Sequence, residues 1–156
     1  MAHAADDLLN TIRGIIASAA PRETRARQFA KSIKSFGQYR WVGVYDVGAE
    51  LVSIIAWSGP SAPAYPTFPV TDGLTGSAIA QRATVVVGDV RKDRRYLTAF
   101  GSTLSEIIAP VIHPQKGTVI GTIDVESERT NAFSDEDRQM LEKCAVAALP
   151  LWDERR

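Results

Sequence analysis

Short runs of aromatic and β-branched residues, joined by tight turns, are the feature that most limits the fold of this chain. One pair of runs spans 41–45 and 51–57, and a second pair spans 106–112 and 118–125. Strands with such short connections pair antiparallel, and the lack of long crossover helices between them argues against a parallel, Rossmann-like sheet. The sequence therefore predicts an α+β fold built on an antiparallel sheet.

Apolar residues spaced three and four apart mark both ends of the chain as helical. Within residues 1–37 they predict two consecutive helices or one long kinked helix, with Pro21 at a helix start and Gly37 at a helix end. Ser134 is the predicted N-cap of a last helix. The remaining predicted elements are an edge strand around Phe68, a short helix at 74–81, a small strand at 84–87 and a charged loop at 91–95.

Composition limits the partners of the chain. Its 156 residues suit a single domain, and 18 basic and 18 acidic residues give zero net charge, hence no bulk attraction to nucleic acid or an anionic membrane. No apolar run approaches the roughly 18–20 residues that span a bilayer, and residues 1–7 lack a signal-peptide pattern. With a single cysteine, Cys144, we expect a cytoplasmic protein.

No metal site and no cofactor are predicted. His3 and His113 do not fall at a metal-ligand spacing. His113 stands beside Pro114 between two predicted strands, so we expect its side chain to be exposed.

Six short motifs, taken in order, resemble those of GAF domains, and among these the free methionine-(R)-sulfoxide reductase branch. They are WVGVY from Trp41, DGLTG from Asp72, TVVVGDV from Thr84, SEIIAPV from Ser105, VIGTIDVES from Val119 and FSDED from Phe133. The resemblance implies one GAF domain over 1–156, with N-terminal helices at 1–37 and the GAF core at 40–149. It also implies a six-stranded antiparallel sheet with terminal helices on one face and a ligand pocket on the other.

The resemblance also shows what this chain lacks. The reductase branch uses cysteines near Tyr65, after the glycine turn, and just before the Ser-Glu-Ile stretch. Here the second place holds Thr75, the third holds Ala99 or a neighbour, and the loop 58–70 has no cysteine. Sulfoxide reduction by this route needs a thiolate and a resolving thiol, so no catalytic residue is predicted. Cys144 is interpreted as a buried core residue.

The binding side of the pocket is retained. The resemblance implies a pocket that holds an amino-acid substrate. Asp124 and Glu126 alternate on a strand, so they share a face about 6–7 Å apart. Acids gathered in a pocket repel one another until one takes up a proton or a cation sits among them, and an ammonium-bearing ligand held partly by aromatic faces would meet that need. The predicted ligand-binding residues are Trp41, Tyr45, Thr75, Glu106, Asp124 and Glu126.

Other interpretations of the sequence stay open. The acids could be solvated or paired, and the aromatic residues could close the pocket. The basic residues within 91–95 could contact phosphate or lie in a solvated loop, and the turn at 72–76 could cradle an anion or be a glycine turn. The sequence favours a non-catalytic, small-molecule-binding sensor module. The alternatives are a free methionine-(R)-sulfoxide reductase or a relative with altered chemistry, and a structural dimerisation or partner-binding module with a closed pocket.

The first predicted helix carries an apolar stripe that looks too wide for one packing surface. A helix from a second subunit would cover the excess, so the sequence predicts a homodimer through the terminal helices. The stripe consists of Leu8, Leu9, Ile12, Ile15 and Ile16.

Overall fold

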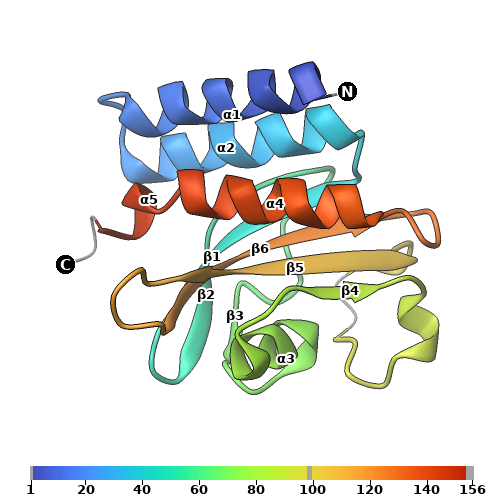
Figure 1. Ribbon diagram of the computed structural model, residues 1–156. Coiled ribbons are helices and arrows are strands. Elements are labelled where there is room, and N and C mark those ends of the chain that lie inside the picture. Colours follow the sequence, from blue (N-terminus) through green and yellow to red (C-terminus); the bar gives the residue numbers. More distant parts are fainter. Residues whose placement is uncertain (1, 98–99, 154–156) are drawn as a thin grey trace.

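The computed structural model describes residues 2–97 and 100–153, in which helices lie on both faces of one six-stranded sheet (Figure 1). In chain order the elements are α1 (Ala2–Ala17), α2 (Arg22–Gly37), β1 (Trp41–Val47), β2 (Leu51–Ser58), β3 (Thr67–Pro69), α3 (Gly73–Gln81), β4 (Val85–Val87), the 3₁₀ helix η1 (Val90–Lys92), β5 (Ser105–Ile112), β6 (Val119–Ser127), α4 (Asp135–Ala147) and α5 (Pro150–Asp153).

All neighbouring strands of the sheet run antiparallel, in the order β3-β2-β1-β6-β5-β4. The predicted α+β fold is therefore confirmed. Strand β6 lies inside the sheet and pairs with β1 on one side and β5 on the other. The register sets Glu126 between Trp41 and Glu106, and Asp124 opposite Gly43.

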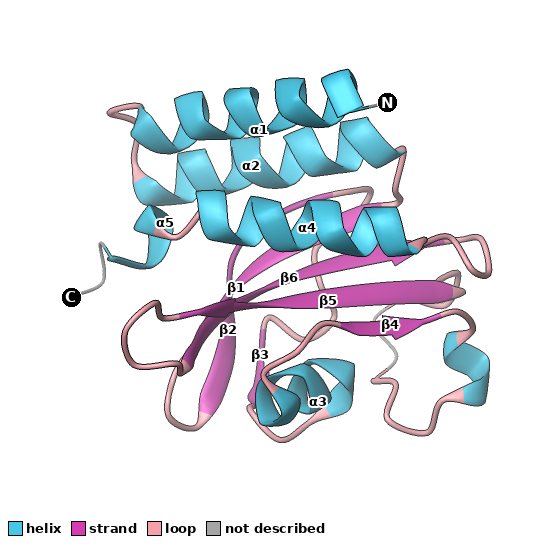
Figure 2. Ribbon diagram, viewed as in Figure 1, coloured by secondary structure: helices cyan, strands magenta, loops and turns pink. Residues whose placement is uncertain are grey.

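The helices α2 and α4 cover one face of the sheet, and α1 packs on both of them (Figure 2). The apolar spacing within residues 1–37 thus belongs to two separate helices. Pro21 is the N-cap that precedes the first residue of α2, one position earlier than expected. The main hydrophobic core lies between these helices and the sheet and includes Phe29, Val44, Ile107, Ile123 and Leu151.

The short helix α5 was not predicted from the sequence. It carries Trp152, whose indole Nε1 donates a hydrogen bond of 3.2 Å to the carbonyl oxygen of Tyr45. Gly121 lies directly under the same ring, since a Cβ added there would come within 2.1 Å of the Trp152 Nε1. The end of the chain is therefore anchored on the two central strands.

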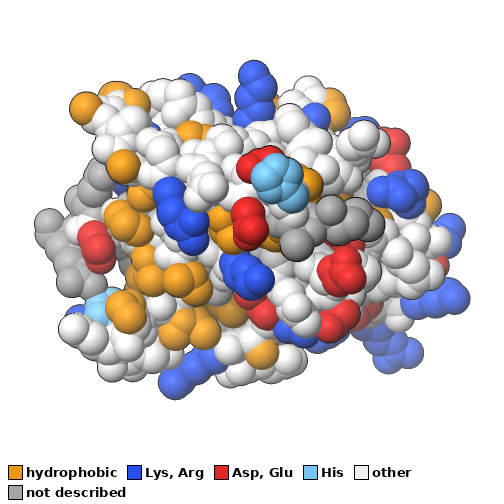
Figure 3. All heavy atoms as spheres, turned by 45° about the horizontal axis from the view of Figure 1, so that its top comes forward, with side chains coloured by type: hydrophobic (Ala, Val, Ile, Leu, Met, Phe, Trp, Pro, Cys, Tyr) orange, Lys and Arg blue, Asp and Glu red, His pale blue; other side chains and the backbone are white. Residues whose placement is uncertain are grey.

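The wide apolar stripe of α1 is covered within the chain. Leu8, Leu9, Ile12 and Ile16 are buried, and only Ile15 is half-buried, because α2 and α4 both pack against the helix. The expected excess of exposed apolar surface on α1 is therefore absent from the described residues. The argument from this stripe no longer supports a homodimer, which stays a prediction. Figure 3 views this helical side, where acidic and basic side chains intermingle and hydrophobic ones gather at one end.

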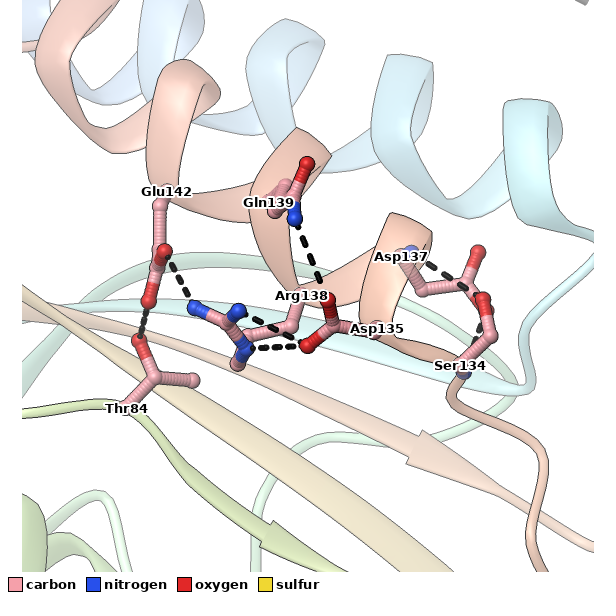
Figure 4. A network of polar contacts seen from close by, with 7 residues as sticks. All are labelled: Thr84, Ser134, Asp135, Asp137, Arg138, Gln139 and Glu142. Atoms are coloured by element: carbon pink, nitrogen blue, oxygen red, sulfur yellow. Dashed lines mark hydrogen bonds and ion pairs between the residues drawn. The ribbon is translucent and has the colours of Figure 1, made fainter.

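The last helix begins as expected. The Ser134 hydroxyl accepts a hydrogen bond from the Asp137 backbone N–H, while the Asp137 carboxylate accepts one from the Ser134 N–H, which makes a capping box (Figure 4). One helix turn later Arg138 bonds to Glu142, which accepts a 2.6 Å hydrogen bond from the Thr84 hydroxyl. This network ties α4 to the segment that enters β4.

His113 is buried, with 5% of its surface exposed, so the expectation of an exposed side chain was wrong. Its ring folds over its own turn, where Nδ1 accepts hydrogen bonds from the backbone N–H groups of Gln115 and Lys116. A turn leaves such N–H groups without backbone partners, and the ring supplies the acceptor. Among the described helices, none has the length and hydrophobicity that crossing a bilayer requires.

Substitution of Gly121 by alanine tests the seat of Trp152. The added methyl group would push the buried indole away, and such overpacking costs about 1–3 kcal/mol in the free energy of unfolding. Gly14 in α1 has nothing within 4 Å of an added Cβ, so Gly14→Ala should instead stabilise the fold by about 0.5–1 kcal/mol. Urea unfolding of both variants measures the difference, and equal effects would show that Trp152 does not rest on Gly121.

Candidate functional site

A partly open hollow with a cavity volume of about 40 Å³ lies on the face of the sheet opposite α2 and α4. Strands β1, β5 and β6 form its floor, and α3 and two loops form its walls. The hollow is lined by Trp41, Tyr45, Pro63, Tyr65, Phe68, Gly73, Leu74, Thr75, Tyr96, Leu97, Glu106, Asp124 and Glu126. All six residues that the sequence predicted for ligand binding are among them.

Strand alternation explains why the acids meet in the hollow. On β6, Asp124 and Glu126 point to the pocket face, whereas Val125 between them packs in the main core beneath the helices. Glu106 of β5 stands opposite Glu126 in the register, so the three carboxyl groups come from adjacent strands. Alternation along the sequence predicted that Asp124 and Glu126 share a face of β6. The pairing of β5 with β6 explains why Glu106, expected from the family resemblance, lies beside them.

Gly43 makes room for two of the lining aromatic rings, a role that sequence reasoning missed. A Cβ at this position would lie 2.3 Å from the Trp41 ring and 2.8 Å from the Tyr45 ring. The glycine therefore lets both rings fold over the same strand, and their centroids are 6.5 Å apart. The signal was present in the sequence, because a residue without a side chain stands midway between two aromatic residues of one strand face.

Aromatic side chains form the other wall of the hollow. The Tyr45 ring meets Phe68 edge-on at 5.8 Å, and Trp41 lies 5.4 Å from Phe100. The Trp41 indole Nε1 donates to the carbonyl oxygen of Ser61, which fixes the ring against the loop after β2. The site thus combines π-faces with carboxyl groups, a composition that suits an organic cation.

Two threonine hydroxyls hold two of the acids. Thr75 Oγ1 donates to Asp124 Oδ2 at 2.9 Å, and Thr103 Oγ1 donates to Glu126 Oε1 at 2.8 Å. The carboxyl group of Glu106 has no hydrogen bond to any other described residue, although Glu106 is only 8% exposed. Thr103 was not predicted, because it lies in a loop without a recognisable pattern. Only the folded chain brings that loop over β6.

Burial raises the pKa of every acid in the hollow. Desolvation lifts the pKa of Asp124 to about 7, against the opposing effects of the Thr122 and Thr75 hydroxyls. Desolvation likewise lifts the pKa of Glu126 to about 7, although the hydrogen bonds from Thr103 and Tyr96 pull it down. The pKa of Glu106 rises well above its usual range through burial and the charges of Glu126 and Asp124.

No positive group among residues 2–97 and 100–153 neutralises these acids by an ion pair. Arg40 is the cation whose charge is felt at Glu126, but its guanidinium pairs with Glu128 and lies over the Phe100 ring. Asp124 Oδ1 is fully buried and has no hydrogen-bond partner in the described structure. Among the described residues, no group of three or more His, Cys, Asp or Glu side chains has an arrangement that could hold a metal ion.

The structure gives local roles to the basic loop at 91–95 and to the glycine turn at 72–76. Arg91 and Arg95 each form a two-point contact with an aspartate two residues earlier, Asp89 and Asp93, in an exposed loop. The first turn of α3 requires its glycines. Gly73 has φ +68°, and a Cβ on Gly76 would come within 2.5 Å of the Thr71 backbone.

Comparison with known proteins places this arrangement in a family. The sequence model of the GAF domain matches residues 21–148. This chain belongs to the GAF domain family. GAF domain-containing protein A of Dictyostelium discoideum is 28% identical to this GAF domain over 137 residues, which are 87% of this chain and 84% of that protein.

Two solved reductases resemble this GAF domain closely in structure. Free methionine-R-sulfoxide reductase from Neisseria meningitidis, solved in complex with its substrate, superposes with a TM-score of 0.86 and 26% identity, covering 96% of this chain and 88% of that one. The type II enzyme from Thermoplasma acidophilum gives a TM-score of 0.74 with 30% identity, covering 85% of this chain and 96% of that one. The GAF domain therefore has relatives in the branch that its motifs indicated.

The thiol chemistry of that branch has no counterpart in the described pocket of this GAF domain. Thr75 occupies the place of one expected cysteine, and Ala99, at another, lies outside the described residues. The one cysteine, Cys144, lies in α4 on the opposite side of the sheet and is 1% exposed. Burial raises the pKa of its thiol to about 12, so it is protonated and unreactive near neutral pH.

The acids of this GAF domain should make its stability depend on pH. The pKa of Asp124 is about 7 in the folded chain against 3.8 ordinarily, so the folded state binds more protons between about pH 4 and pH 7. The free energy of unfolding should fall across that window as pH rises, by on the order of 4 kcal/mol for this group. Urea unfolding at pH 4.5 to 8 measures the slope.

Asp124→Asn should flatten this slope and be more stable than the parent protein at pH 8, because the amide carries no charge to desolvate. Asp6→Asn, an exposed change in α1, is the matched control and should leave the slope unchanged. A slope that Asp124→Asn does not alter would mean that this carboxyl is not desolvated.

Proposed function

We propose that this chain is a small-molecule-binding GAF module of the sensor or regulatory kind, which binds an amino-acid-like, ammonium-bearing metabolite and does not reduce it. The ligand lies in the hollow over β1, β5 and β6, with its ammonium group among Glu106, Asp124 and Glu126. Its apolar part lies against Trp41 and Tyr45.

One observation carries the proposal: three buried carboxyl groups share a hollow that has no cation of its own among the described residues. Burial of like charges is unfavourable unless a positive group or protons balance them. The Glu106 carboxyl group retains acceptor oxygens that no described residue occupies. A primary ammonium group has three N–H donors and one positive charge. It would donate hydrogen bonds to the unoccupied carboxylate oxygens and would balance their negative charge.

The relatives support the class of ligand, and the residues of this chain argue against the reaction. A relative of known structure binds the substrate of a free methionine sulfoxide reductase, and such a substrate is an amino acid. Reduction through cysteine requires that a thiolate attack the sulfoxide and a second thiol resolve the product as a disulfide. A threonine hydroxyl in place of the thiol performs neither step.

Ligand binding should be visible as thermal stabilisation. We expect at least one member of a panel of amino acids and methionine sulfoxide to raise the melting temperature, because a ligand at 100 times its Kd adds about 2.7 kcal/mol to the free energy of unfolding. Cyclic nucleotides serve as the contrasting class. A panel without any shift would favour the alternative of a structural or partner-binding module with a closed pocket.

Asp124→Asn should weaken the ligand found in that panel. Loss of one carboxylate from a buried charge pair costs about 2 kcal/mol or more, which is roughly a thirtyfold rise in Kd. Isothermal titration calorimetry measures the change, with Asp6→Asn as the control. Unchanged affinity in Asp124→Asn would place the ligand elsewhere.

The reductase alternative has a direct assay. With free methionine sulfoxide, thioredoxin, thioredoxin reductase and NADPH, we expect no oxidation of NADPH above the rate without protein, because the pocket has no described thiol. Cys144→Ala should behave as the parent protein does. Turnover by the parent protein, and above all turnover abolished by Cys144→Ala, would overturn the non-catalytic assignment.

A further inference from the structure

The three carboxyl groups of the hollow are not equivalent in their surroundings. Asp124 and Glu126 each accept a hydrogen bond from a threonine hydroxyl, from Thr75 at 2.9 Å and from Thr103 at 2.8 Å. The Glu106 carboxyl group accepts none from the described residues, although Glu106 is buried as well. A hydrogen bond to a carboxylate favours its charged form, so the two anchored acids ionise more readily than the third.

We propose that Glu106 carries a proton while the hollow is empty, and that it releases this proton to solvent when the ammonium group of the ligand enters. This inference rests on the proposed function for the identity of the cation, but the location of the proton in the empty protein does not. Above their pKa of about 7, Asp124 and Glu126 are then the ionised partners that remain in place. The balance is one ammonium bound for one proton lost from the Glu106 carboxyl group.

Every element packed around Glu106 favours its neutral form. From β6 it faces the carboxyl groups of Asp124 and Glu126, and from β1 the neutral phenol of Tyr45, whose pKa burial and the three acids hold above its usual value. On β4 its register partner is the uncharged Val87. Burial and the two like charges act in the same direction.

Within the described stretches, the loops and helix around the hollow add no cation. The Thr75 hydroxyl from α3 is committed to Asp124, and the Tyr96 hydroxyl in the loop before β5 lies 3.5 Å from Glu126. Arg40, at the start of β1, is engaged by Glu128. Three carboxylates in one hollow would repel one another. When Glu106 is protonated, its repulsion with Asp124 and with Glu126 disappears, so the neutral form of Glu106 has the lower free energy.

The occupancy of the proton can be measured without any ligand. The protein is labelled with ¹³C at the side-chain carboxyl groups of Glu and Asp, and their NMR chemical shifts are followed as the pH is changed. The variants Glu106→Gln and Asp124→Asn assign the resonances. We expect Glu106 to be protonated at pH 7 and to titrate above both Asp124 and Glu126. A Glu106 midpoint near that of exposed glutamates, or below the other two, would overturn the proposal.

The threonines should act as positioning residues for this order. Thr75→Val should raise the midpoint of Asp124, and Thr103→Val that of Glu126, by removing a hydrogen bond to the charged form. In each case the Glu106 midpoint should fall, because a neighbouring negative charge becomes a neutral acid. Thr67→Val, in the exposed edge strand β3, is the matched control and should move no pocket resonance. A purely structural role for Thr75 would leave the midpoints where they are.

Proton release on binding is measured with L-methionine as the probe. Calorimetry at pH 8, above the pKa of about 7 of Asp124 and Glu126, in buffers of different ionisation enthalpy should give close to one proton released by the parent protein and close to none by Glu106→Gln. Binding of L-methionine without proton release would overturn the release. Failure of L-methionine to bind would count against the amino-acid ligand of the proposed function, while the NMR titration would still decide whether Glu106 holds the proton.

Discussion

The pairing of β6 with β1 on one side and β5 on the other is the constraint on which the rest of this structure depends. It places residues of three strands in register, so that Glu126 lies between Trp41 and Glu106. A shift of one residue in either ladder would turn Asp124 and Glu126 toward the helices and Val125 toward the hollow. Since Val125 is fully buried in the main core, that shift would expose apolar surface and bury acids without partners.

This register divides the domain into a stable side and a polar side. Between the sheet and α2 and α4, the side chains of Val44, Ile107 and Ile123 are buried in an apolar core. On the opposite face the same strands present carboxyl groups whose pKa values are raised by burial, which is unfavourable for stability near neutral pH. Such an arrangement is typical of a binding site, where the fold stabilises groups that a ligand later neutralises.

The relation to the reductases is one of shared architecture with a changed centre. The fold is shared, and at the place where the family resemblance implies a thiol this chain has the Thr75 hydroxyl, which has a structural partner in Asp124. Thr75 therefore helps to hold a carboxylate whose desolvation would otherwise favour its neutral form. The remaining thiol, Cys144, is separated from the hollow by the sheet.

The sequence alone determined the strands, most of the helices, the α+β class and the family resemblance, because periodicity, turn residues and short motifs are local signals. It also predicted six of the residues that line the hollow, since strand alternation and the family motifs can be recognised within short stretches of sequence. It did not predict α5, and it did not decide between one helix and two within residues 1–37. The tertiary structure decided what depends on contacts between distant segments. Thr103 reaches Glu126 from a loop without a pattern, Trp152 bonds to Tyr45 across the domain, and His113 folds over its own turn. The width of the α1 stripe was visible in the sequence, but only packing against two helices showed that the chain itself covers it.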